Sequence, residues 1–279
     1  MKKRLTVKDL QNLKGKKQLV LITVKNVEEA IAAEKVGIEM LGTGSPGRYK
    51  NPDNHQNFDE LIKIREAAPS TFMHYGAADT LYANEYEACK LALKAIEYGF
   101  DMFYCHRSFN IINSLYQEGV PVLGHVGLIP GRTTWTGGYK AVGKTAKEAT
   151  DLYDKCLRLE ESGVVAIEME CVPEKIASAI SKRVKPTVLS LGSGAGCDAQ
   201  YLFACDILLT TTGHVPKHSK SYRNFLKEFE RLQLEREAAF KEFYDDVNSG
   251  SFPEKKHIVE IEECELEVFL NSLEKRKMI

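Results

Sequence analysis

The sequence predicts an α/β fold of the (β/α)8 TIM barrel type, and two observations lead to this prediction. Eight short apolar or β-branched runs alternate with helix-like stretches along most of the 279 residues. Several helix-like stretches end in a glycine followed by a hydrophobic residue, as in Gly37-Ile38 and Gly163-Val164, a pattern typical of a left-handed helix cap ahead of a strand. Eight strands, each followed by a helix or a loop, favour a parallel barrel, and a doubly wound open sheet is the alternative.

The individual elements follow from local composition. Runs rich in apolar and β-branched residues predict strands at residues 19–24, 38–42, 71–75, 102–105, 120–123, 165–170, 187–191 and 206–210. Between them, helices are predicted at residues 27–36, 57–67, 85–98, 109–118, 147–162 and 174–183, with a long charged helix at 222–247 and an acidic amphipathic one at 258–273. In either candidate fold, functional residues should lie at the carboxyl ends of the strands.

Composition limits the classes of function. A chain that is 43% hydrophobic, with a formal net charge of -1, can bury the core of one large domain and carries no long basic run for nucleic acid. No apolar stretch is long enough to span a bilayer and the first residues lack an apolar leader, so we expect a cytoplasmic protein. The seven cysteines are scattered without a CxxC pair, which favours buried thiols over disulfides or zinc.

The predicted strand at 165–170 ends in two carboxylates. Side chains two residues apart on a strand share one face, so Glu168 and Glu170 should point the same way. Burying an ionised carboxylate is costly unless another group pairs with it or the reaction uses it, and we therefore place the chemistry here. If both side chains point into the barrel, their repulsion should raise the pKa of at least one, unless a histidine neutralises the pair.

Three histidines follow or end consecutive predicted strands: His74, His106 and His125. With Glu168 or Glu170 they could bind a softer divalent ion such as zinc. The alternative is three unrelated histidines, each hydrogen-bonded to backbone or to a neighbour. We favour this alternative and assign no metal ligand, because no HxxxH or HxH spacing is present.

Five motifs occur in the order and approximate spacing of a known family. They are Gly-His-Val-Gly-Leu-Ile-Pro at 124–130, Gly-Gly-Tyr-Lys at 137–140, Glu-Cys-Val-Pro at 170–173, Leu-Gly-Ser-Gly-Ala-Gly at 191–196 and Gly-His-Val-Pro-Lys at 213–217. With them the chain resembles the ketopantoate hydroxymethyltransferases over about residues 5 to 257. The resemblance implies a single barrel domain at 1–257, and residues 258–279 form a helical extension.

The resemblance implies an enzyme of the phosphoenolpyruvate/pyruvate superfamily that acts in pantothenate biosynthesis and forms homo-oligomers. Such an enzyme removes a proton beside the keto group of 3-methyl-2-oxobutanoate, then adds a one-carbon unit from methylenetetrahydrofolate. In the family, carboxylates after strands two, three and four hold magnesium, and the corresponding residues here are Gly44, Gly76 and His106. Because magnesium prefers oxygen ligands in octahedral geometry, we do not expect a magnesium site of the family type.

The resemblance also implies roles for single residues. Glu170 corresponds to the catalytic base, and Ser45, His125, His106 and Tyr104 are the predicted substrate-binding residues. Tyr104 replaces a family lysine near the substrate carboxylate, a role that Arg48 or Arg107 could take. Two classes of function stay open. One is a diverged enzyme that enolises a small 2-oxo acid for hydroxymethyl transfer or related carbon-carbon chemistry, and the other is a catalytically silent barrel kept for ligand binding or assembly.

Overall fold

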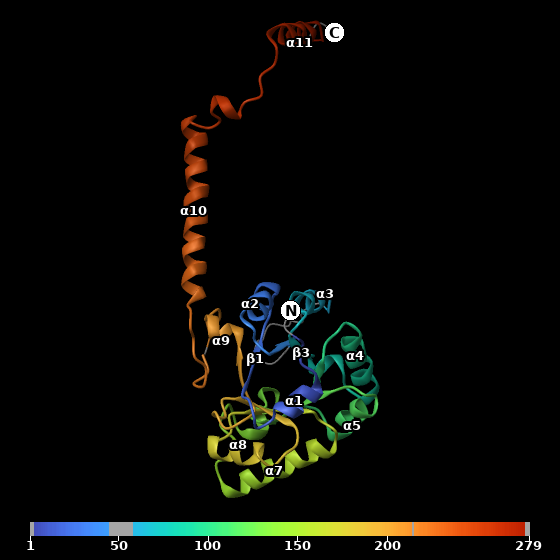
Figure 1. The fold of residues 1–279 in the computed structure, drawn as a ribbon. Helices are drawn as coiled ribbons and strands as arrows, with labels where there is room; N and C mark the ends of the chain where they lie inside the picture. The colour runs from blue at the N-terminus through green and yellow to red at the C-terminus, as the bar shows by residue number, and fades with distance from the viewer. Residues whose placement is uncertain (1–2, 45–57, 214, 277–279) are drawn as a thin grey trace. The chain divides into compact units, whose positions relative to one another are not determined.

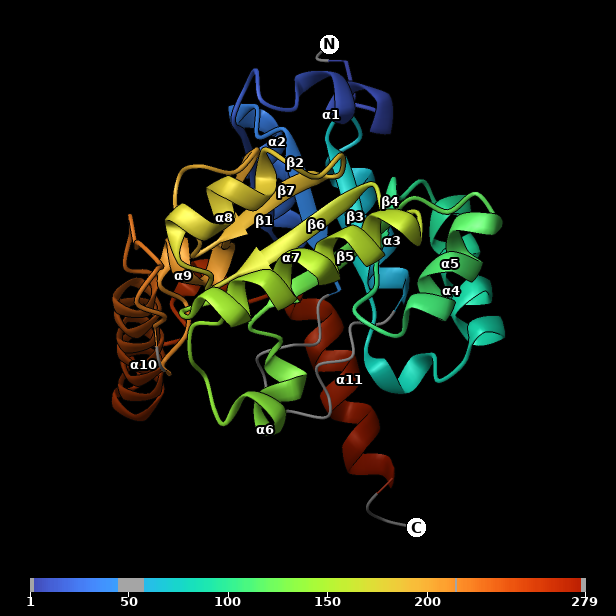
Figure 2. The same ribbon diagram turned by 90° about the horizontal axis from the view of Figure 1, so that it is seen from below.

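The strands of the protein close into a parallel barrel, as predicted. The computed structural model describes residues 3–44, 58–213 and 215–276. Each strand pairs in parallel with the next, and the eighth pairs with the first, from Leu19 opposite Ala199 to Thr23 opposite Phe203. Helices surround the barrel on the outside, and Figure 1 and Figure 2 show this arrangement from two directions.

The strands of the barrel are β1 (Leu19–Thr23), β2 (Met40–Thr43), β3 (Phe72–Gly76), β4 (Met102–Tyr104), β5 (Val122–Gly127), β6 (Ala166–Glu170), β7 (Thr187–Leu191) and β8 (Ala199–Phe203). The first seven lie where the sequence predicts them, with shifts of a few residues at their ends. The prediction for the eighth, at 206–210, is wrong. Residues 204–208 form a helix there, and the strand lies earlier in the chain.

The sequence pattern places the eighth strand wrongly because a short apolar run, such as residues 206–210, fits a helical turn as well as a strand. The true β8 has the sequence Ala-Gln-Tyr-Leu-Phe, which contains no β-branched residue and is a weak strand signal. What selects it is closure of the barrel, because β8 must hydrogen-bond to β1 on one side and β7 on the other.

The helices of the barrel unit are α1 (Val7–Leu13), α2 (Val27–Val36), α3 (Phe58–Ala67), α4 (Glu85–Glu97), α5 (Phe109–Gln117), α6 (Thr133–Thr136), α7 (Ala146–Glu161), α8 (Glu174–Ser181) and α9 (Ala204–Leu208). Helix α2 illustrates how their ends are set. The side chain of Asn26 accepts a hydrogen bond from the backbone N–H of Glu29, and Gly37 ends the helix at φ 82°. Helix α1 and the short α6 were not predicted.

The core has two layers, one inside the barrel and one between the strands and the surrounding helices. Leu21, Met40, Phe72 and Leu123 fill the barrel interior, and Leu10 of α1 packs into the same cluster. Helix α1 therefore covers an end of the barrel interior. Burying a leucine side chain in this way contributes about 1.5–3 kcal/mol to the stability of the fold.

The chain divides into two compact units, Met1–Asn224 and Phe225–Ile279. The second contains helices α10 (Phe225–Ser249) and α11 (Glu263–Arg276). The domain boundary predicted at residue 257 falls inside this second unit. None of the helices in the described part of the chain is long and apolar enough to cross a membrane.

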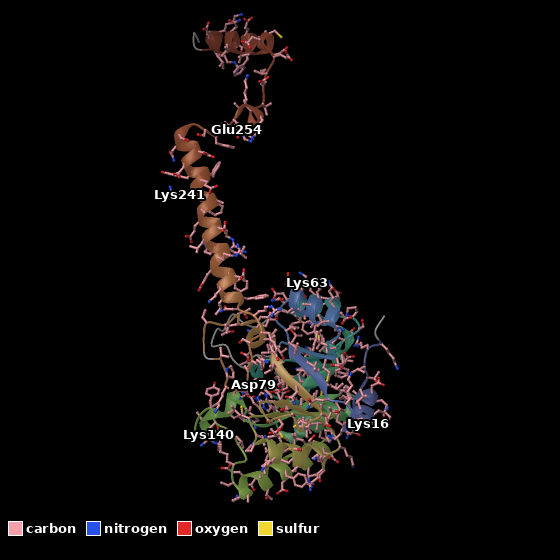
Figure 3. All side chains as sticks on the ribbon, turned by 60° about the vertical axis from the view of Figure 1, so that its left-hand side comes forward. Lys16, Lys63, Asp79, Lys140, Lys241 and Glu254 are labelled. Atoms are coloured by element: carbon pink, nitrogen blue, oxygen red, sulfur yellow. The ribbon has the colours of Figure 1, made fainter. Side chains whose placement is uncertain are left out.

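The two faces of the barrel carry different loops. Lys16 lies in the turn before β1, and Lys140 lies in the loop that follows β5. Figure 3 shows these two lysines on opposite sides of the barrel unit. The loops after the strands, which hold Asp79 and Lys140, form the face on which barrels of this type place their active sites.

Candidate active site

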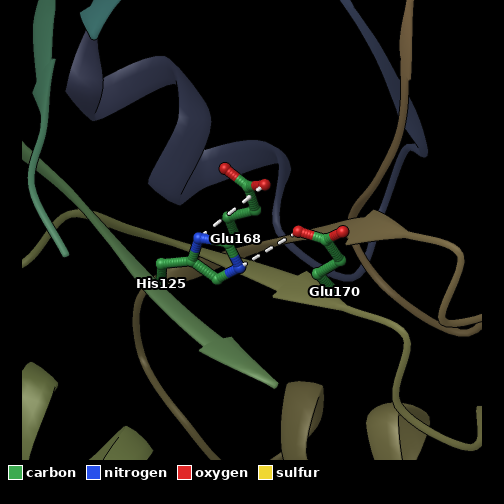
Figure 4. Close-up of side chains that lie close together, drawn as sticks. All are labelled: His125, Glu168 and Glu170. Atoms are coloured by element: carbon green, nitrogen blue, oxygen red, sulfur yellow. Dashed lines mark ion pairs between the residues drawn. The ribbon is translucent and has the colours of Figure 1, made fainter. Parts of the chain in front are cut away.

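Two carboxylates and one imidazole meet inside the barrel. His125 lies between Glu168 and Glu170, with Nε2 3.4 Å from Glu170 Oε2 and Nδ1 4.0 Å from Glu168 Oε1 (Figure 4). All three side chains are buried, with 2%, 5% and 3% of their residue surfaces exposed. Both glutamates therefore share one face of β6. His125 lies between them, where its positive charge can neutralise the repulsion between the two carboxylates.

The strand pairing of β5 and β6 sets this arrangement. His125 is opposite Glu168 and Gly127 is opposite Glu170 in the parallel register. Alternation along β6 places Ala166, Glu168 and Glu170 on one side, and Ala166 belongs to the interior cluster. Gly127 adopts φ 86°, and a Cβ there would lie 2.1 Å from the carbonyl oxygen of Glu170, so only glycine allows this close approach.

The carboxylates control the charge of His125. Burial opposes the charged imidazolium, but the negative charges of Glu168 and of Glu170, 3.4 Å away, outweigh it and raise the pKa of His125. A proton on both ring nitrogens gives His125 two donors. The two carboxylates therefore favour the charged imidazolium form of His125 in this buried site.

Tyr104, at the end of β4, contacts the same imidazole. Its hydroxyl oxygen lies 2.7 Å from His125 Nδ1. Burial and then the charge of Glu168 raise the pKa of Tyr104 well above its ordinary value, so the phenol is neutral. When His125 is protonated, its Nδ1–H donates to the phenol oxygen, and the hydroxyl proton is available for another acceptor.

His106 lies apart from the glutamates and pairs with Asp79, with 3.2 Å between Nε2 and Oδ2. Asp79 also lies 3.8 Å from Arg107, and the hydrogen bond from His106 leads the causes that lower the pKa of Asp79. Arg132 donates to the carbonyl oxygen of His106 at 2.7 Å. The sequence analysis missed Asp79, for which the available signal was its position directly after β3.

His74, on β3, belongs neither to the His125 cluster nor to the His106–Asp79 pair. Its ring centroid is 6.5 Å from that of Tyr201, and burial lowers its pKa to about 4, so the imidazole is neutral. Its Nδ1 has no hydrogen-bond partner among the residues that the structure describes. The three predicted histidines therefore have three different environments.

Other residues of the predicted site and of the loop after β5 lie away from these groups or outside the described residues. Ser45, Arg48 and His214 lie outside the described residues. Trp135 and Tyr139, in the loop after β5, are 90% and 74% exposed. They do not contribute to the buried site within one chain.

Comparison with known proteins decides the family. A family model described as ketopantoate hydroxymethyltransferase matches residues 64–255. The chain belongs to this family. The 3-methyl-2-oxobutanoate hydroxymethyltransferase 2 of Aliivibrio fischeri is 30% identical over 91% of this chain and 99% of its own length. The corresponding enzyme of Halalkalibacterium halodurans is 29% identical over 87% of this chain and 85% of its own length.

Solved structures support the fold alone, because their sequences are distant. A 2,3-dimethylmalate lyase of the PEP mutase/isocitrate lyase superfamily is 12% identical, with a TM-score of 0.52 over 72% of this chain and 82% of that one. A phosphonopyruvate hydrolase is 11% identical, with a TM-score of 0.51 over 99% of this chain and 100% of that one. Both likenesses agree with the barrel described above.

The residues at the positions that the resemblance assigns to magnesium ligands do not fit that ion. Gly44 adopts φ 74°, and a Cβ there would lie 2.4 Å from the carbonyl oxygen of Gly76, so this backbone has no room for a carboxylate side chain. Gly76 offers no side chain, and His106 is paired with Asp79. His125, Glu168 and Glu170 have ligand atoms within 4.8 Å of one another. We propose that the positive charge between Glu168 and Glu170 is a proton on His125 rather than a metal ion, in agreement with the raised pKa of His125.

Proposed function

We propose that the protein enolises a small 2-oxo acid, with Glu170 as the base, as the first step of hydroxymethyl transfer or of related carbon-carbon chemistry. The observation that carries the proposal is the position of Glu170. It ends β6 inside the barrel, 3% exposed, at the face where the loops after the strands meet. Membership of the family supports the same reaction class.

The first step moves one proton. Glu170 accepts it from the carbon beside the keto group, and the electron pair of the broken C–H bond moves onto the keto oxygen to form an enolate. In the family-type reaction, that carbon then attacks the one-carbon unit of methylenetetrahydrofolate. The new C–C bond would form as the bond from that unit to one folate nitrogen breaks. Water would then replace the second folate nitrogen on that carbon to give the hydroxymethyl group, and the two folate nitrogens would take up the proton of water and the proton removed from the substrate.

Hydrogen-bond donors can stabilise the enolate without the family magnesium. The imidazolium of His125 donates to Tyr104, which polarises the phenol and makes its own proton a better donor. A fixed donor in a buried site stabilises developing negative charge by several kcal/mol. We propose that Tyr104 donates to the enolate oxygen and that His125 supplies the positive charge behind it.

Loss of the C3 proton of 3-methyl-2-oxobutanoate in deuterated water, followed by NMR with and without divalent ions, tests the proposal. We expect exchange in the native protein and a decrease of about 100-fold or more in Glu170→Gln, the usual size of a lost general base. Glu97→Gln, an exposed glutamate at the end of α4, is the matched control and should exchange at the native rate.

A catalytically silent barrel is the competing function, supported by the absence of carboxylates at positions 44, 76 and 106. It predicts no exchange in the native protein with any ion, and no effect of Glu170→Gln. That result would refute the proposed enolisation.

A further inference from the structure

A basic pocket lies beside the candidate active site. It has a volume of about 470 Å³, within the range of small-molecule sites, and His125 forms part of its lining. Arg107, Arg132 and Lys155 supply positive charge to its wall. Ile111, Ile112, Phe109 and Leu159 supply apolar surface.

Different elements bring the cations together. Arg107 precedes α5, Arg132 follows β5, and Lys155 lies on α7. The bond from Arg132 to the carbonyl oxygen of His106 fixes one guanidinium at the wall. Arg107 is held by Asp79, at 3.8 Å, and lies over the ring of Tyr82. These contacts hold Arg107 and Arg132 at the pocket wall.

Lys155 lies close to other positive charge. Burial, followed by the charge of Arg132, lowers the pKa of Lys155 to about 8. Asp151, one turn earlier on α7, pairs with Lys147 instead, at 3.0 Å. Within the described parts of the chain, no carboxylate lies within ion-pair distance of Lys155. Like charges in a half-buried pocket are unfavourable, and a bound anion would relieve their repulsion.

We infer that this pocket binds an oxyanion, a phosphate or a carboxylate group, between Lys155 and Arg132. Arg107 lies on the same wall, and Asp79 partly neutralises Arg107 and, more weakly, Arg132. The first turn of α5, which begins at Phe109 in the pocket lining, adds the positive end of its helix dipole. Because His106 and His125 also line the pocket, the anion site adjoins the proposed active site. The inference does not depend on the proposed function, because oxyanion binding requires no turnover.

Calorimetric titration of the full chain with inorganic phosphate and, separately, with succinate tests the inference. We expect saturable binding of at least one anion, weaker by about tenfold or more in Lys155→Met and Arg132→Gln, as for loss of a partly buried charge. Lys147→Met removes an exposed lysine from the same helix and should leave the affinity unchanged. The preferred anion distinguishes a phosphate from a carboxylate ligand.

No saturable binding of either anion, or equal weakening in Lys155→Met and Lys147→Met, overturns the inference. If Lys155→Met does not fold, labelling of the native protein with acetic anhydride decides. The better-binding anion should slow acetylation of Lys155 relative to that of Lys147. Equal labelling of both lysines with and without the anion also overturns it.

Discussion

The residues at the centre of the site form a chain of polar contacts. Glu170 contacts His125, and His125 contacts Tyr104, with 3.4 Å and 2.7 Å between the paired atoms. Each side chain is held by a strand of the barrel, so the contacts require little rearrangement. In this series of contacts, Tyr104 acts through its hydroxyl group.

Tyr104→Phe removes that hydroxyl group and keeps the ring. We expect C3 proton exchange to slow by about tenfold or more, because the enolate loses a fixed donor. The free energy of unfolding should fall by only about 1 kcal/mol, the usual worth of one hydrogen bond. NMR exchange and urea denaturation measure the two effects. Tyr116→Phe, with a half-exposed side chain on α5, is the control, and an unchanged exchange rate in Tyr104→Phe would contradict the assigned role.

Lys155 gives a prediction for pH. Its pKa is lowered to about 8, so the free protein loses this charge as the pH rises through that value. Oxyanion affinity should therefore be higher at pH 7 than at pH 9. Titrations at both values measure the ratio, and Lys155→Arg, which stays charged, should show a weaker dependence. A native affinity that is constant across this range would exclude Lys155 as a titrating ligand.

At the scale of the elements, the ends of β2, β3 and β4 distinguish this chain from the pattern that the family resemblance implies. Gly44 and Gly76 are close enough that a side chain at position 44 would collide with backbone. The end of β4 leads to His106, which pairs with Asp79 rather than offering an oxygen ligand. Positions 44, 76 and 106 therefore offer no carboxylate ligand to a hard cation.

Elemental analysis of the purified protein after dialysis tests whether magnesium binds at these positions. We expect less than one equivalent of magnesium per chain, because positions 44, 76 and 106 supply no carboxylate. A full equivalent of magnesium would contradict this. A full equivalent of another divalent ion, lost in Glu168→Gln, would instead place a metal where we assign a proton to His125.

At the scale of the whole molecule, the second compact unit, Phe225–Ile279, carries exposed apolar side chains that bear on oligomer formation. Phe240 and Phe243 on α10 are 73% and 56% exposed, more than apolar side chains of this size usually are. We predict a homo-oligomer in which these side chains are covered. Light scattering coupled to size-exclusion chromatography should give a mass above the 31.3 kDa of one chain.

Phe240→Glu should lower that mass and leave the ellipticity of the barrel unchanged, whereas Lys241→Glu, an exposed neighbouring change, should have no effect. A native protein that runs as a monomer would contradict the prediction of assembly.

Local patterns determined much of this protein. The periodicities and glycine caps predicted the barrel and its first seven strands, because side-chain spacing and left-handed caps are properties of the chain alone. Alternation along β6 also placed Glu168 and Glu170 on one face. The family motifs then indicated the reaction class.

Tertiary structure decided the rest. Barrel closure selected β8 over the run at 206–210, because pairing with β1 and β7 is a non-local requirement. Register between strands brought His125 between two glutamates, and packing of α5 and α7 brought Lys155 to a pocket that its helical pattern did not predict. Such contacts join residues far apart in the chain, so no local pattern of the sequence contains them.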